Sequence, residues 1–182
     1  CKAAGTLTVA TAQLDPMRRL PETAGAIASF VQKAAAAKAD VLLLPEAALT
    51  GYDETAIKGA TKWQLEAAEQ EVRQACATHQ IAAIVGEPSR LVNGDYNSAL
   101  IIGPDGRLVA RQHKMQLVPT DLGWSQPGSQ MHVLHFFGVP CAVIICHDKR
   151  FPELERPPLL ISLYTSTPPL QPDPPRPTTS PP

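Results

Sequence analysis

The sequence has no excess of charge of one sign and no long apolar run. Its 16 Lys and Arg residues balance 17 Asp and Glu residues, which leaves a net charge of −1. So small a net charge gives no electrostatic reason to bind nucleic acid or an anionic membrane. No stretch approaches the roughly 20 apolar residues that cross a bilayer, and no basic patch followed by an apolar run opens the chain as in a secretory signal. We therefore expect no nucleic-acid partner, no membrane partner and a cytoplasmic location.

Cysteine is also scarce, with four residues in a chain of 182. So sparse a set fits reduced thiols better than a disulfide framework. No C-x-x-C pair occurs, and Cys76 with His79 is a single i, i+3 pair, so the spacing predicts no metal site. Nucleotide-binding glycine motifs and the G-x-S-x-G elbow of serine hydrolases are absent as well.

Proline is concentrated at the end of the chain. Ten of the 19 prolines lie within residues 156–182. Proline lacks a backbone donor and favours extended, solvated backbone, so we predict a disordered tail over 156–182, with 159–164 as its one candidate for a short strand or helix. A Pro-rich linker or ligand for an aromatic groove is an alternative. We favour a third interpretation, a frame-shifted or mis-spliced end. We expect the N-terminus to be cut, processed or that of a sequence fragment, because no initiator Met precedes Cys1.

The first 155 residues alternate between two hydrophobic periods, which predicts one α/β domain over 1–155 with helices packed on a sheet. Strands are predicted at 6–14, 41–44, 81–86, 97–102, 107–112, 131–136 and 141–146. Helices are predicted at 21–39 and 64–79, and a further one begins at 151–153. The turn Pro104-Asp105-Gly106 predicts a hairpin between two of these strands.

Two segments place a charged side chain just after a predicted strand. Glu46 follows the apolar run VLLLP, and a carboxylate among apolar neighbours can serve as a general base. A helix-capping or ion-paired glutamate is the alternative. Lys114 follows the strand of the second segment, RQHKMQLVP, and could stabilise a developing oxyanion. A lone lysine is far more often a solvated surface residue, so this signal is weak by itself.

A third segment, PCAVIICHDKRFPE, runs from an apolar strand directly into Cys146. A strand followed by a nucleophile and a helix start would aim the thiol at exposed backbone N–H groups and lower its pKa. Asp148 and Arg150 would fix the turn by capping and pairing. A buried, inert cysteine is the alternative, and it is the interpretation we adopt for Cys141 in the middle of the strand.

Taken in order, these segments resemble the nitrilase superfamily of carbon–nitrogen hydrolases. LLLPEAALTGY matches the glutamate motif of that family, RQHKMQLVP resembles its lysine motif, and AVIICHDKRFPE is very similar to its cysteine motif. TVATAQLDP looks like the first strand, and NSALIIGPDGRLVARQHK resembles the hairpin that leads to the lysine. The resemblance runs from about residue 6 to 155.

The resemblance implies a four-layer α–β–β–α sandwich and a hydrolase of amides, nitriles or carbamoyl compounds that needs no metal or organic cofactor. Glu46 would be the general base and acid, and Cys146 would attack the substrate carbon to form a thioester or thioimidate. Lys114 and the backbone N–H of His147 would stabilise the tetrahedral intermediate, with Asp148 supporting the turn. Full-length members of the family are expected to form homo-oligomers.

Two departures from the family pattern stand out. Many members have a further active-site Glu between the lysine and cysteine motifs, whereas residues 115–145 contain only one acid, Asp121. Asp121 either substitutes for that glutamate or leaves its role unfilled. The resemblance also stops soon after the cysteine motif, so we expect a C-terminally truncated or frame-shifted domain. The competing hypothesis is a remnant with little or no catalysis that acts as an interaction or assembly module.

Overall fold

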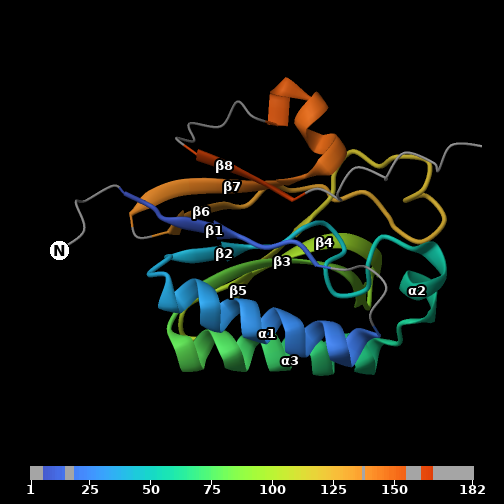
Figure 1. Cartoon of the computed structure of the whole chain (residues 1–182). Helices are drawn as coiled ribbons and strands as arrows, with labels where there is room; N and C mark the ends of the chain where they lie inside the picture. The colour runs from blue at the N-terminus through green and yellow to red at the C-terminus, as the bar shows by residue number, and fades with distance from the viewer. Residues whose placement is uncertain (1–5, 15–18, 137, 155–160, 166–182) are drawn as a thin grey trace, which may run out of the picture.

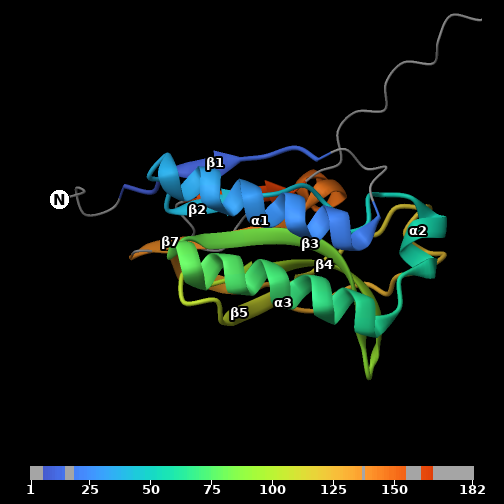
Figure 2. The ribbon, with the colours of Figure 1, turned by 60° about the horizontal axis from the view of Figure 1, so that its bottom comes forward.

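The computed structural model describes residues 6–14, 19–136, 138–154 and 161–165, and two sheets packed face to face form its centre (Figure 1). The first sheet has five strands in the order β1-β2-β3-β4-β5, and the second has three in the order β6-β7-β8. Helices α1 and α3 cover the outer face of the first sheet and run side by side across it (Figure 2). The mixed α/β fold is therefore confirmed. Of the four layers that the resemblance implies, the described residues form three.

The first sheet combines parallel and antiparallel pairing. Its strands are β1 (Val9–Thr11), β2 (Val41–Leu43), β3 (Ala82–Leu91), β4 (Gly94–Ile102) and β5 (Leu108–His113). The first three are parallel, because a helix crosses over between each pair, while β3, β4 and β5 form antiparallel hairpins. The hairpin predicted around Pro104-Asp105-Gly106 is present between β4 and β5. β3 is longer than predicted because it continues to a second hairpin at the turn before Gly94.

Sequence signals indicate where the helices begin. In α1 (Leu20–Ala36), Pro21 lies in the first turn, where its missing N–H has no intrahelical partner to lose. In α3 (Lys62–His79), Thr61 and Gln64 form a capping box. The short helix α2 (Glu54–Gly59), whose first turn is capped by Asp53, was not predicted. None of the helices in the described part of the chain is long and apolar enough to cross a membrane.

The alternating faces of the first sheet bury two separate cores. One lies between the sheet and the helices, and the other lies between the two sheets. The first is built from Ala24, Ile27, Val31, Leu42, Leu44, Ala68, Val72, Ala83, Val85, Leu100 and Ile102, among others. The second contains Val41, Ala82, Ile84, Ala99, Ile101, Cys141, Val143 and Ile145. Cys141 is fully buried in that second core, as its place in an apolar strand predicts.

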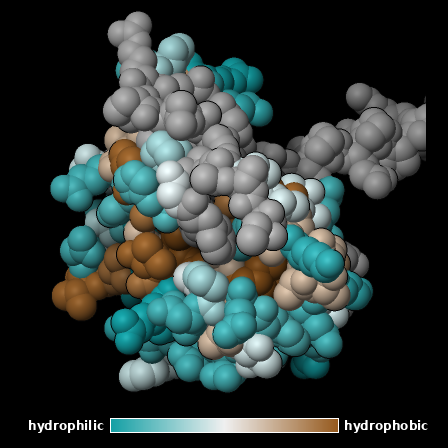
Figure 3. All heavy atoms as spheres, turned by 90° about the vertical axis from the view of Figure 1, so that its left-hand side faces the viewer, coloured by the Kyte–Doolittle hydropathy of each residue, from teal (hydrophilic) through white to brown (hydrophobic). Residues whose placement is uncertain are grey.

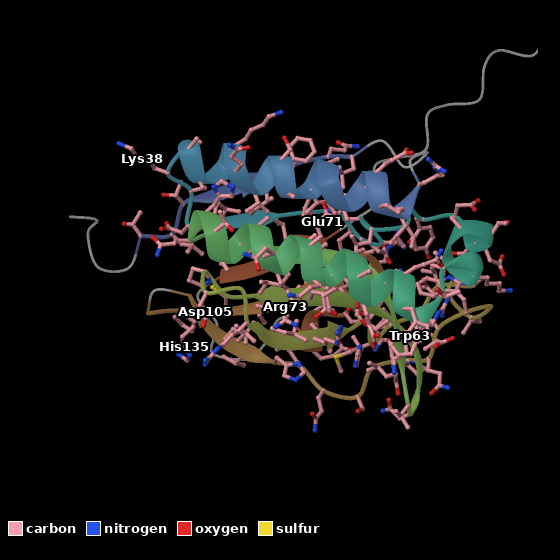
Figure 4. The ribbon with its side chains drawn as sticks, turned by 90° about the horizontal axis from the view of Figure 1, so that it is seen from below. Lys38, Trp63, Glu71, Arg73, Asp105 and His135 are labelled. Atoms are coloured by element: carbon pink, nitrogen blue, oxygen red, sulfur yellow. The ribbon has the colours of Figure 1, made fainter. Side chains whose placement is uncertain are left out.

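Polar contacts add to the packing of α3. Arg73 donates through Nε to the carbonyl oxygen of Gly106 at 2.8 Å and so ties the helix to the β4–β5 turn, which also carries Asp105 (Figure 4).

Trp63, near the start of the same helix, is 78% exposed (Figure 4). On the end face seen in Figure 3, apolar residues gather in a band above a mainly hydrophilic surface.

The second sheet contains β6 (Val133–Phe136), β7 (Val139–Ile145) and β8 (Ile161–Thr165). β6 and β7 are antiparallel, and β8 lies parallel to β7. β8 falls within the segment 156–182 predicted to be disordered, at the stretch singled out as its one candidate for a strand or helix. The remainder of that segment lies outside the described residues, so the predicted disorder there stays a prediction.

Two short 3₁₀ helices, Cys146–Arg150 and Pro152–Leu154, follow β7. The sequence predicted a helix start after the nucleophile and the beginning of a helix at 151–153. Within the described residues both are short 3₁₀ helices, of five and three residues. Prolines and the side-chain hydrogen bonds of Asp148 favour such tight local turns over an extended α-helical ladder.

Candidate active site

Glu46 lies in a tight turn that leaves β2 and folds back against β3. Two backbone bonds hold the turn, from Leu44 to the carbonyl oxygen of Ile84 at 2.9 Å and from Leu49 to that of Gly86 at 3.1 Å. The approach is so close that a methyl group on Gly86 would lie 2.3 Å from the carbonyl oxygen of Pro45. Only glycine fits there without displacing the backbone. The turn buries the Glu46 side chain, which is 3% exposed.

Lys114 follows β5 and is the largest fully buried side chain of the described residues, with 0% exposure. Its backbone N–H donates to the carbonyl oxygen of Asn97 at 2.8 Å. Its ammonium group donates to Glu46 Oε1 at 2.7 Å and to Asp121 Oδ2 at 2.8 Å. The surface-lysine alternative is therefore wrong for this residue. Because an ammonium has three N–H donors, one remains beyond these two ion pairs.

Cys146 occupies the bend between β7 and the first 3₁₀ helix. Its backbone is left-handed, with φ of 48°, a conformation that costs energy for any residue with a Cβ. Asp148 supports the bend, since its Oδ2 accepts the backbone N–H of Ile145 at 3.1 Å. The His147 ring packs edge-on against Phe151, with centroids 5.5 Å apart. This strand–bend–turn geometry keeps Cys146 partly exposed while Cys141 stays buried.

Asp121 is fully buried and lies beside Lys114 and Glu46. Its Oδ1 accepts the hydroxyl of Tyr52 at 2.6 Å, and the backbone N–H of Val118 donates to its Oδ2 at 2.9 Å. This acid, the only one that the sequence offered for the additional role, thus lies within the cluster.

The charges in this cluster determine the protonation states of its members. Burial would lower the pKa of Lys114, but the carboxylates of Glu46 and Asp121 outweigh burial and raise it above its usual value. Burial would raise the pKa of Asp121, but hydrogen bonds from Lys114 and Tyr52 hold it below its usual value. Lys114 is therefore a cation and Asp121 an anion near neutral pH. Burial raises the pKa of Asp148, although hydrogen bonds from the backbone N–H groups of Gln116, Ile145 and Met115 act against it.

The thiol of Cys146 behaves differently from the sequence-based expectation. Burial and then the negative charge of Glu46 raise its pKa, and the positive charge of Lys114 only partly offsets them. The predicted lowering by a helix start is wrong, because a single 3₁₀ turn has few aligned peptides and a carboxylate lies nearby. A neutral thiol next to a carboxylate requires a base to ionise it.

The structure brings Glu46, Lys114 and Asp121 into direct contact and places Cys146 where the charges of Glu46 and Lys114 act on its thiol. Sequence reasoning missed two further members, Asn97 and Tyr52. Asn97 donates to Glu46 Oε1 at 2.7 Å, and the Lys114 ammonium lies 5.9 Å from the Tyr52 ring centre. A polar residue opening the apolar strand NSALII and an aromatic closing LTGY were the signals that could have indicated them.

The sequence pattern of the carbon-nitrogen hydrolase family matches residues 8–159, which is most of the chain. The chain belongs to the carbon-nitrogen hydrolase family. Among curated proteins, it is 29% identical over 119 residues to 2-oxoglutaramate amidase of Bacillus subtilis (strain 168), covering 63% of this chain and 46% of that protein. It is 30% identical over 158 residues to glutamine-dependent NAD(+) synthetase of Xylella fastidiosa, covering 81% of this chain and 28% of that one.

Solved structures support the same fold. A mutant of the Nesterenkonia AN1 amidase, from the nitrilase superfamily, superposes with a TM-score of 0.80 at 23% identity, covering 91% of this chain and 66% of that one. Another structure of an amidase from Nesterenkonia sp. is 26% identical with a TM-score of 0.70, covering 84% of this chain and 60% of that one. The expected nitrilase-superfamily fold is thus confirmed. The chain spans less than half the length of the two curated relatives.

Proposed function

We propose that this chain hydrolyses a small primary carboxamide to a carboxylic acid and ammonia, with Cys146 as the nucleophile. The observation that carries the proposal is the buried Glu46–Lys114–Asp121 cluster beside a strained, partly exposed cysteine. Burying charged groups costs desolvation free energy even when the charges are paired, and perturbed groups of this kind gather at functional sites. Membership in the carbon-nitrogen hydrolase family fits this chemistry.

Glu46 is the proposed general base. Its Oε1 is held by Lys114 and Asn97, whereas its buried Oε2 has no hydrogen-bond partner among the described residues. That oxygen takes the thiol proton as the sulfur of Cys146 attacks the amide carbon, and a C–S bond forms. The resulting oxyanion would accept the third N–H of Lys114 and the backbone N–H of His147.

Collapse of this intermediate breaks the C–N bond, and ammonia leaves with the proton that Glu46 returns. Water, deprotonated by the same carboxylate, then attacks the thioester and releases the acid and the free thiol. Asp121 takes the place of the additional family glutamate: it balances the charge of Lys114 and orients it toward the oxyanion. No step in this sequence calls for a metal or an organic cofactor.

The comparisons support a primary amide over a nitrile or a carbamoyl compound as substrate. The Nesterenkonia amidase has been solved with acrylamide, with butyramide and with a covalent adduct of acrylamide at its active-site cysteine. The curated relatives act on 2-oxoglutaramate or depend on glutamine. All four compounds carry a terminal carboxamide, so this group is the shared substrate feature. A homo-oligomer, as expected for the family, is proposed on the resemblance alone.

Ammonia release from acetamide, butyramide, glutamine and 2-oxoglutaramate tests the proposal directly. We expect turnover of at least one amide, and we expect Cys146→Ala to lower it by at least about 10³-fold, since the covalent route is lost. Cys141→Ala removes a thiol from the same strand but not from the site, and it should keep its activity in the folded fraction. Turnover that survives Cys146→Ala would refute the proposal.

A further inference from the structure

Asn97 lies on β4 at the centre of the cluster. Because its side chain is neither charged nor nucleophilic, the sequence analysis did not single it out. It is fully buried, and it pairs with Pro88 of the neighbouring strand β3. Its backbone N–H donates to the Ser125 hydroxyl oxygen at 2.9 Å, and its carbonyl oxygen accepts the Lys114 backbone N–H at 2.8 Å. Both backbone groups are thus held by hydrogen bonds.

The side-chain amide of Asn97 joins the two carboxylates of the cluster. Its Nδ2 donates to Glu46 Oε1 at 2.7 Å and to Asp121 Oδ1 at 3.2 Å. The Lys114 ammonium joins the same two carboxylates from the other side, to Glu46 Oε1 and Asp121 Oδ2. The four side chains form a closed ring in which two donor groups alternate with two acceptor groups.

Charge explains why a neutral amide belongs in this ring. Glu46 and Asp121 bring two negative charges, and Lys114 supplies one positive charge. A second cation would compete for the oxyanion, whereas an apolar residue would remove one of the two donors to Glu46 Oε1. The two N–H dipoles of the amide stabilise both anions without adding charge.

The orientation of the amide follows from its neighbours. Since both groups facing it are carboxylate oxygens, the nitrogen must point toward them. The Asn97 oxygen is then buried without a hydrogen-bond partner among the described residues. A buried polar group left unpaired is a cost to stability, so a residue chosen for packing alone would not carry it.

We propose that Asn97 is a positioning residue that holds the Glu46 carboxylate by Oε1 and so presents Oε2 to the Cys146 thiol. This inference rests on the proposed function for its role in turnover, but the placement of Glu46 against the thiol can be measured without turnover. The charged and titratable groups facing the amide are Glu46 after β2, Lys114 after β5, and Asp121 with Tyr52 across the cluster.

The decisive measurement is the rate of Cys146 alkylation by iodoacetamide against pH, resolved by peptide mass spectrometry. Removing two N–H donors leaves the carboxylate charges less compensated, so Asn97→Ala should move the profile upward by about half a pH unit or more. Asn97→Asp adds a negative charge and should move it further in the same direction. Asn97→Ser, which keeps one donor, should lie between the wild type and Asn97→Ala.

Gln112 offers a matched control on the neighbouring strand. It is a buried amide, 1% exposed, whose Nε2 donates to the carbonyl oxygens of Gln130 and His113, both at 2.9 Å, and not to the carboxylates of the cluster. Gln112→Ala should lower stability and leave the alkylation profile unmoved. An Asn97→Ala profile that coincides with the wild type, in protein shown to be folded by circular dichroism, would overturn the inference. So would an equal shift in both variants, because the effect would then be general loosening.

Turnover separates this inference from the proposed function. With an amide that the wild type hydrolyses, Asn97→Ala should lower kcat about 10- to 100-fold with KM within about threefold, since Glu46 acts in the transition state. The acidic limb of the kcat–pH profile of Asn97→Ala should move to higher pH than that of the wild type. If the wild type shows no amide turnover, or turnover that does not require Cys146, the proposed function is refuted. The alkylation profile would still decide the role of Asn97.

Discussion

The carboxylate of Asp148 accepts the backbone N–H of Gln116 at 2.7 Å, and this bond joins the two segments that carry the candidate catalytic residues. Gln116 lies two residues after Lys114, at the end of the first sheet. Asp148 lies two residues after Cys146, at the end of the second. The same carboxylate also accepts from Met115 at 3.1 Å and from Ile145 at 3.1 Å, so one side chain sets the distance between nucleophile and cation.

Asp148→Ala should therefore lower both stability and activity. Three backbone N–H groups, one buried and two partly buried, would lose their acceptor, which costs about 1–3 kcal/mol of unfolding free energy. We also expect kcat to fall at least tenfold, because the segments bearing Lys114 and Cys146 would no longer be joined. Asp53→Ala is the matched control, since Asp53 caps α2 by accepting from Ala56 at 2.8 Å. It should cost about 1 kcal/mol and leave kcat unchanged. Equal losses of kcat in both variants would contradict this role.

The rate at which each thiol is alkylated should depend on its exposure, and for Cys146 also on the charge of Glu46. In a Cys1→Ser background, iodoacetamide should modify Cys146 before Cys76 and Cys141, which are both buried. Because the Glu46 charge raises the pKa of the Cys146 thiol, Glu46→Gln should move its rate profile to lower pH. Peptide mass spectrometry across pH 6–10 measures both effects. A profile that moves to higher pH in Glu46→Gln would contradict the charge relationship.

Local signals in the sequence predicted most elements of the fold correctly. The Pro104-Asp105-Gly106 turn predicted the β4–β5 hairpin, and Pro21 indicated where α1 begins. These features depend on neighbouring residues, so a sequence alone reveals them. α2 was missed because six residues are too few to show a helical period, even though Asp53 caps it.

The cluster around Glu46 depends on contacts that no local pattern encodes. The Asn97–Glu46 bond spans 51 residues, and the Tyr52–Asp121 bond spans 69. The motifs could therefore predict Glu46 and Lys114, but not Asn97 and Tyr52, which complete the cluster. The raised pKa of Cys146 was missed for the same reason, since burial and a distant carboxylate determine it.

Gly86→Ala should displace the turn that carries Glu46. The added methyl group would lie 2.3 Å from the carbonyl oxygen of Pro45 and 2.5 Å from the nitrogen of Ala47, and backbone atoms cannot move aside cheaply. We expect a loss of about 1–3 kcal/mol in unfolding free energy, together with a fall in amide turnover. Gly59→Ala, at the end of α2, meets no atom within 4 Å and should be neutral or stabilise by up to about 1 kcal/mol. Full activity in Gly86→Ala would show that the turn tolerates displacement.

Glu87 should make the protein less stable as the pH rises. It is 2% exposed on β3, and its Oε1 accepts from Arg111 at 2.9 Å and Ser89 at 2.8 Å. Burial outweighs both partners and raises its pKa to about 7 from 4.5. The folded state thus holds the proton more tightly than the unfolded chain. Its contribution is therefore fully present below about pH 4.5 and is lost as the pH rises through 7.

Glu87→Gln keeps the shape of the side chain without the ionisation, so its unfolding free energy should not decline across this window. At pH 8 we expect it to exceed the wild type by about 1–3 kcal/mol, the upper value following from the size of the pKa rise. The gain in unfolding free energy is reduced because a neutral amide at position 87 binds Arg111 more weakly than the Glu87 carboxylate does. Urea denaturation at pH 5, 6, 7 and 8 measures the difference, and Glu66→Gln on the exposed side of α3 is the control, with no expected change. A wild-type stability that rises from pH 5 to 8 relative to Glu87→Gln would reverse the sign of this argument.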